Sequence, residues 1–167
     1  MTHRIKFPIG DWSDDGHGKV DWFIVKSNKS LEDLIGAHLL FKEKVGFDIG
    51  EICAEYEENI ITGIIAQFVK DLNVLGDGDE YEVLNEKGEY VDEHNTGLLS
   101  LLPINGQISI LDTKTVLKIW LACLRYADPE LELEVEADDL PSMINWSVAG
   151  TKYKGQYLDT PGYGMFH

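Results

Sequence analysis

Apolar residues near the start of the chain indicate two β-strands. His3 to Ile9 and Val20 to Val25 are rich in β-branched and aromatic residues, and the segment 10–18 between them holds three glycines and three aspartates. Apolar runs of this kind, bounded by glycine and aspartate, are typical of strands joined by a loop. We therefore expect the chain to begin with β structure.

Two later stretches carry the spacing of amphipathic helices. Ser30 precedes apolar residues at intervals of three and four, Asp33 stands where the third residue of a capping box belongs, and Gly46 ends the pattern. Asp112 begins a similar stretch, which we expect to end just before Pro129 because proline disfavours helical geometry in the preceding residue. Both stretches are therefore predicted to be helices that bury one apolar face.

The same periodicity runs through residues 48–73. It predicts either one long helix or two helices with a break near Asn59 to Gly63. Together with the other two stretches, this gives about three amphipathic helices.

Two hairpins are predicted between residues 81 and 111. The first places Tyr81 to Leu84 opposite Glu89 to Val91. The second places Leu98 to Ile104 opposite Gln107 to Leu111, with Asn105-Gly106 as a two-residue turn that accepts positive φ angles. In this hairpin Gly106 is expected to take a left-handed conformation.

Residues 130–136 alternate between glutamate and aliphatic side chains, the two-residue period of a strand with one wet and one dry face. Leu131, Leu133 and Val135 are expected to face the core. The exposed face would then carry Glu130, Glu132, Glu134 and Glu136.

Residues 143–148 and 153–158 predict two further short strands, and we expect the terminal segment 160–167 to be mobile. The order of elements lacks the regular alternation of a doubly wound fold. The sequence therefore predicts one α+β domain over residues 1–167, with a mainly antiparallel sheet and hairpins packed against about three amphipathic helices.

Charge narrows the possible partners. The chain holds 14 lysines and arginines against 30 aspartates and glutamates, a formal net charge of −16, and the acidic subregion 77–139 alone carries 16 acidic and four basic residues. Such a negative field opposes binding to nucleic acid phosphates and favours a basic protein partner. A solvated acidic surface without a partner is the alternative interpretation.

The cysteines and the lengths of the apolar runs indicate where in the cell the protein is expected. Cys53 and Cys123 each lie in an apolar stretch, which predicts two buried free thiols in a reducing compartment. No apolar run reaches the roughly 18 residues that a membrane span needs. We expect a cytoplasmic protein with no membrane association.

The segment 11–16 contains oxygen-bearing side chains at alternate positions followed by Gly16, which matches the first half of a calcium loop. Trp22 occupies the position where a bidentate glutamate would close a helix-loop-helix site, so only a calcium loop in a β context is compatible. A turn held by Asx hydrogen bonds is the alternative. The candidate ligands are Asp11, Ser13, Asp15 and His17.

Two hypotheses about function follow. The chain is an interaction protein, such as an inhibitor, immunity or antitoxin-like factor, whose glutamates at 130–136 bind a basic partner. Alternatively, it is a small divalent-metal-binding module or metal-dependent enzyme that uses the Asp11–His17 loop. The sequence contains no nucleophile elbow and no phosphate-binding loop of the expected spacing, so no catalytic residue or further cofactor is assigned.

Overall fold

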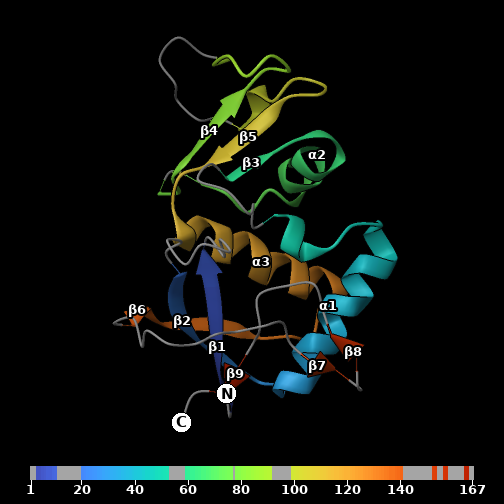
Figure 1. The fold of residues 1–167 in the computed structure, drawn as a ribbon, viewed down its shortest axis with the longest axis vertical. Helices are drawn as coiled ribbons and strands as arrows, with labels where there is room; N and C mark the ends of the chain where they lie inside the picture. The colour runs from blue at the N-terminus through green and yellow to red at the C-terminus, as the bar shows by residue number, and fades with distance from the viewer. Residues whose placement is uncertain are drawn as a thin grey trace.

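The fold belongs to the α+β class (Figure 1). The computed structural model describes residues 3–10, 20–52, 59–76, 78–91, 99–140, 152–153, 156–157 and 164–165. Within these ranges the chain forms three α-helices and antiparallel strands, as the sequence predicts.

Sheet A lies at one end of the molecule (Figure 1) and combines strands from the early and late parts of the chain. Its strand order is β6-β2-β1-β9, with antiparallel pairing throughout. The two strands predicted at the start of the chain are confirmed and pair with each other from His3–Ser27 to Gly10–Val20. The bounds are β1 (His3–Gly10), β2 (Val20–Ser27), β6 (Leu133–Leu140) and β9 (Gly164–Met165).

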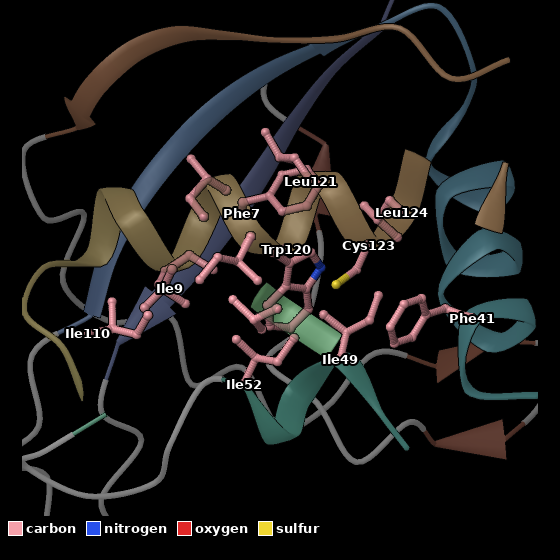
Figure 2. Close-up of a cluster of buried hydrophobic side chains, with 14 of the residues drawn as sticks. Phe7, Ile9, Phe41, Ile49, Ile52, Ile110, Trp120, Leu121, Cys123 and Leu124 are labelled. Carbon is pink, nitrogen blue, oxygen red and sulfur yellow. The ribbon is translucent and has the colours of Figure 1, made fainter. Parts of the chain in front are cut away.

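The inner face of sheet A packs on α3 (Thr113–Ala127), and α1 (Leu31–Val45) packs against α3 within the same buried cluster. Alternate residues of β1 and β2 are fully or almost fully buried on this face because side chains alternate across a strand. Figure 2 shows Trp120 of α3 directed toward Ile49 and Ile52 within this core. The inner-face residues are Ile5, Phe7, Ile9, Phe23 and Val25.

Both helices begin and end where their capping signals predict. The Ser30 hydroxyl accepts a hydrogen bond from the Asp33 amide at 3.2 Å, and Gly46 ends α1 with a φ of 88°. Asp112 accepts a hydrogen bond from the Thr115 amide at 2.8 Å and so caps α3. These local signals, read from the sequence, are confirmed.

The prediction for residues 48–73 is wrong in its first half. A 3₁₀ turn, η1 (Ile49–Glu51), precedes strand β3 (Asn59–Ile61), and among the described residues of this stretch only α2 (Gly63–Leu72) is α-helical. The β-branched pair Ile60 and Ile61 fits a strand, and this strand pairs with β5. Residues 53–58, including Cys53, lie outside the described residues.

Sheet B has the strand order β3-β5-β4 and lies with α2 on the opposite side of α3 from sheet A (Figure 1). Its other strands are β4 (Tyr81–Leu84) and β5 (Gln107–Ile110). The predicted pairing of residues 98–104 with residues 107–111 is wrong, since β5 pairs with β3 and β4 and a 3₁₀ turn, η2 (Leu99–Leu101), occupies the expected strand.

The turn before β5 also differs from the prediction. Asn105 takes the positive φ, 62°, and the Gly106 amide donates a hydrogen bond to the Pro103 carbonyl at 2.9 Å. Gly106 is not left-handed. A Cβ at Gly106 would stand 2.7 Å from Cδ1 of Leu102, so contact rather than backbone angle requires glycine.

The first predicted hairpin is confirmed in its turn, at residues 85–88, but not in its second strand. The Gly88 amide donates to the Asn85 carbonyl, and Leu84 forms an isolated bridge with Tyr90 instead of a full second strand.

Near the end of the chain, β7 (Lys152–Tyr153) pairs with β8 (Gln156–Tyr157). The predicted strand 143–148 lies outside the described residues, and mobility of residues 160–167, two of which form β9, stays a prediction.

Four aromatic rings connect the two sheets through the helices. Phe41 of α1, Phe47, Phe68 of α2 and Tyr126 of α3 contact one another edge to face, with centroid distances of 5.2–6.1 Å. We call these residues the aromatic joint. Residues of both sheets belong to the same buried cluster.

Among the residues that the structure describes, no helix combines the length and the apolar character that crossing a membrane requires.

Candidate interaction surface

The four glutamates predicted to bind a partner, at positions 130, 132, 134 and 136, lie on the edge strand β6 of sheet A and on the residues just before it. The strand begins at Leu133, three residues later than predicted, and one backbone hydrogen bond, from the Asn28 amide to the Glu132 carbonyl at 3.3 Å, precedes it. The Glu132 amide donates to Oδ1 of Asn28 at 2.9 Å, and Nδ2 of Asn28 donates to the Glu130 carbonyl at 2.9 Å. Asn28 therefore joins this segment to the end of β2.

The aliphatic residues of this segment are buried to different degrees. Leu131 is 3% exposed and Leu133 packs against the core, as predicted. Val135 lies on the inner face of sheet A, as predicted, because it is paired with the buried Val25, but it is 39% exposed, so the expected burial is not reached. It pairs with Val25 in the outermost position of sheet A, where the described residues do not cover it.

Two register shifts interrupt β6. Val25 pairs with Val135 and Ile24 with Ala137, which leaves Glu136 as an extra residue, and a second shift precedes the Trp22–Leu140 pair. Bulges increase local twist and disturb the row of free backbone groups that invites edge-to-edge pairing. The strict alternation seen in the sequence therefore ends at Glu136.

We call the four glutamates the acidic strip, and among the residues that the structure describes they form ion pairs only at its two ends. Arg4 of β1 donates two hydrogen bonds to Glu136, at 2.7 and 2.9 Å. Lys29 lies 2.6 Å from a carboxylate oxygen of Asp128 and 3.5 Å from one of Glu130. The strip consists of Glu130, Glu132, Glu134 and Glu136.

The ion pairs lower the pKa of two of these carboxyl groups, those of Glu136 and Asp128. The hydrogen bond from Arg4, reinforced by the charges of Arg4 and Lys26, lowers the pKa of Glu136 against a smaller opposing effect of burial. The hydrogen bond from Lys29 lowers the pKa of Asp128 in the same way. Both carboxylates therefore stay ionised at neutral pH.

The middle of the acidic strip remains open. Glu132 and Glu134 are exposed, and no ion pair within the described part of the chain includes either of them. Glu134 stands opposite Lys26 in the register of β2 and β6. The strip can therefore offer at least two solvated carboxylates to a cation, in addition to the largely solvated Glu130, whose side chain is 86% exposed.

The other candidate site cannot be placed. Asp11, Ser13, Asp15 and His17 all lie outside the described residues, so the calcium hypothesis stays a prediction. Within the described residues, no three histidine, cysteine, aspartate or glutamate side chains are grouped so that they could hold a metal ion.

A buried polar pair also stands out. His38 of α1 is completely buried, and its Nε2 lies 3.1 Å from Oδ1 of Asp48. A histidine on the apolar side of an amphipathic helix is typically a hydrogen-bonded core residue, and His38 is one. The sequence pattern does not indicate Asp48 as its partner, because it predicts helix over residues 48–73. Burial raises the pKa of Asp48, but the hydrogen bond and charge of His38, the hydrogen bond from the Gly50 amide and the charge of Lys42 together outweigh it, so the pKa is lowered overall.

Cys123 is confirmed as a buried free thiol. Burial raises its pKa to about 12, which removes the thiolate that nucleophilic or redox chemistry needs at neutral pH.

Comparison with known proteins adds no relative: no family model, no curated protein and no solved structure matches the chain.

Proposed function

We propose that this protein is a non-enzymatic interaction factor, of the inhibitor, immunity or antitoxin type, that binds a basic protein partner through the acidic strip. The observation that carries the proposal is the open middle of the strip, where Glu132 and Glu134 are exposed without an ion pair among the described residues. Solvated carboxylates next to a rigid sheet steer a cationic partner and give binding that depends strongly on salt.

The charge of the whole chain supports a protein partner over a nucleic acid. A net charge of −16 repels phosphate backbones at long range. The buried free thiol of Cys123 supports a reducing compartment, and we propose the cytoplasm.

Binding kinetics with a matched pair of variants test the proposal. Partners cross-linked to the chain in a lysate of its native cell at low salt are identified and purified, and binding is measured by surface plasmon resonance at several salt concentrations. E132Q/E134Q should slow association about tenfold at low salt and flatten its salt dependence. E43Q/E86Q, which removes two exposed carboxylates elsewhere and gives the same net charge, should act much less.

Two results contradict the proposal. The first is a basic partner that binds E132Q/E134Q with the association rate and salt dependence of the unmodified chain. The second is an equal effect of both variants, which would assign the binding to net charge alone.

A further inference from the structure

Strand β6 has an edge at which, within the described residues, no further strand pairs. It is the outermost strand of sheet A, in the order β6-β2-β1-β9. Residues 133–135 pair in regular register with residues 25–27 of β2, and the first register shift comes only after Val135. We call the side of residues 133–135 that faces away from β2 the open edge. A regular edge of this kind can accept one more strand.

The backbone groups at the open edge follow from the ladder between β2 and β6. The Asn28 amide donates to the Glu132 carbonyl at 3.3 Å and continues the register of the two strands, so these residues form a hydrogen-bonded pair. In an antiparallel ladder such pairs alternate with pairs whose N–H and C=O groups point away from the partner strand. The backbone groups of Glu134 therefore point toward β2, whereas those of Leu133 and Val135 point to the open edge.

The side chains at this edge differ between the two faces of the sheet. Val135 lies opposite Val25, which is completely buried, yet Val135 is itself 39% exposed. Glu134 lies opposite Lys26 on the other face and is exposed. Neighbours on adjacent strands contact each other on the same face. An added strand would therefore place apolar residues beside Val135 and is favoured by a basic residue beside Glu134.

A second copy of β6 does not fit this edge. The strand itself carries Glu134, Glu136, Asp138 and Asp139, and like charges directly opposite each other destabilise a strand pair. The net charge of −16 adds repulsion between copies at longer range. Charge complementarity instead favours a cationic segment in which lysine or arginine alternates with aliphatic residues.

We propose that the open edge of β6 binds an extended basic segment of a partner protein by β-strand addition. The segment lies antiparallel to β6, as the described strands of sheet A lie to one another, with aliphatic residues opposite Leu133 and Val135 and basic residues opposite Glu132 and Glu134. Backbone hydrogen bonds provide the pairing and the alternating side chains provide the specificity. This inference rests on the proposed function and refines it by naming the conformation of the bound segment.

A designed peptide, acetyl-Lys-Val-Lys-Val-Lys-Val-amide, serves as the probe and is titrated into the full chain. Two-dimensional NMR should show saturable shifts of the Leu133 and Val135 amides, and hydrogen exchange should show both amides protected in the complex. The block peptide acetyl-Lys-Lys-Lys-Val-Val-Val-amide has the same charge but cannot match both faces of the edge. We expect it to bind about tenfold more weakly.

Two N-methylated forms of the alternating peptide test the backbone hydrogen bonds directly. In the proposed arrangement the valine N–H groups of the peptide face β6, and its lysine N–H groups face away. Methylation of the second valine nitrogen should therefore weaken binding about tenfold, whereas methylation of the second lysine nitrogen should change it less than about twofold.

V135P tests the same hydrogen bonds from the side of the protein. It removes an N–H that points away from β2, and proline is tolerated at such positions of an edge strand. V135P should weaken binding of the alternating peptide about tenfold, whereas V135T, which keeps the N–H and the branched shape, should bind it like the unmodified chain. Circular dichroism checks that both variants fold, and the methylated peptides need no variant at all.

Equal binding of the two methylated peptides would overturn strand addition, as would unshifted amides of Leu133 and Val135 at millimolar peptide. A dimer of the unmodified chain that V135P dissociates in sedimentation would also overturn it, because the edge would then hold a second copy. If E132Q/E134Q weakens peptide binding but V135P and methylation do not, the acidic strip binds cations through side chains alone. Strand addition then fails while the proposed function stands.

Discussion

Gly106 shows how a single residue can be required by its neighbours instead of by its backbone angles. A Cβ at this position would meet Leu102 Cδ1 and Pro103 Cδ at 2.7 Å and the Pro103 carbonyl oxygen at 2.9 Å. The backbone carbonyl cannot move aside cheaply. The short loop before β5 is therefore built around the missing side chain.

We expect Gly106→Ala to lower the free energy of unfolding by about 1–3 kcal/mol, the usual cost of forcing extra atoms into a packed site. Urea denaturation followed by circular dichroism measures the change. Gly76→Ala is the matched control, because Gly76 has open space around its Cβ position and no positive φ. Equal stability of the two variants would show that the loop can relax around the methyl group.

At the scale of elements, the acidic strip rests on residues that contribute unequally to stability. Leu131 is 3% exposed, whereas Val135, four residues later on the same side, is 39% exposed. We expect Leu131→Ala to cost about 2–5 kcal/mol through the cavity that it leaves, and Val135→Ala to cost less than about 1 kcal/mol. Thermal and urea unfolding of the two variants compare them directly, and a larger loss for Val135→Ala would contradict the burial seen here.

Secondary-structure elements could be predicted where the residues that define their ends lie next to them in the sequence. The strands β1 and β2 have glycine-rich boundaries, and α1 and α3 have their caps within three residues of the first turn. The pattern failed where distant pairing decides the structure. Ile60 and Ile61 continue a helical spacing, yet they pair with β5, some 50 residues later in the chain.

The same distinction applies to the candidate sites. The exposed glutamates of the acidic strip could be predicted because strand periodicity is local. Their cationic partners, Arg4 and Lys29, could not, because they lie about a hundred or more positions away in sequence. The contact between His38 and Asp48 could not be predicted either. It depends on the direction that the chain takes after α1 ends at Gly46, which the sequence pattern does not indicate.

At the scale of the whole molecule, the aromatic joint couples the two sheets. Phe68 is the contribution of α2, and it contacts Phe41, Phe47 and Tyr126. Edge-to-face pairs add to the stability that burial alone provides. Loss of this ring therefore weakens the contact between the sheet B region and α1 and α3 more than it weakens either sheet.

We expect Phe68→Ala to cost on the order of 2–4 kcal/mol and to separate the unfolding of the two sheets. Hydrogen exchange in urea should then show β4 and β5 losing protection before β1 and β2. Ile64→Ala on the same helix is the control, since Ile64 is 71% exposed and should leave a single transition. One shared transition in Phe68→Ala would mean that other contacts couple the sheets.

The way in which the chain divides between its sheets has a consequence for the order of folding. Sheet B uses only residues from the middle of the chain, whereas sheet A places β6 and β9 from its later part beside β2 and β1 from its start. Contacts between distant residues require closure of long loops and slow the search for the native state. Sheet B can therefore form once residues 59–110 have left the ribosome, whereas the second edge of β1 stays unpaired until residues 164–165 have been synthesised.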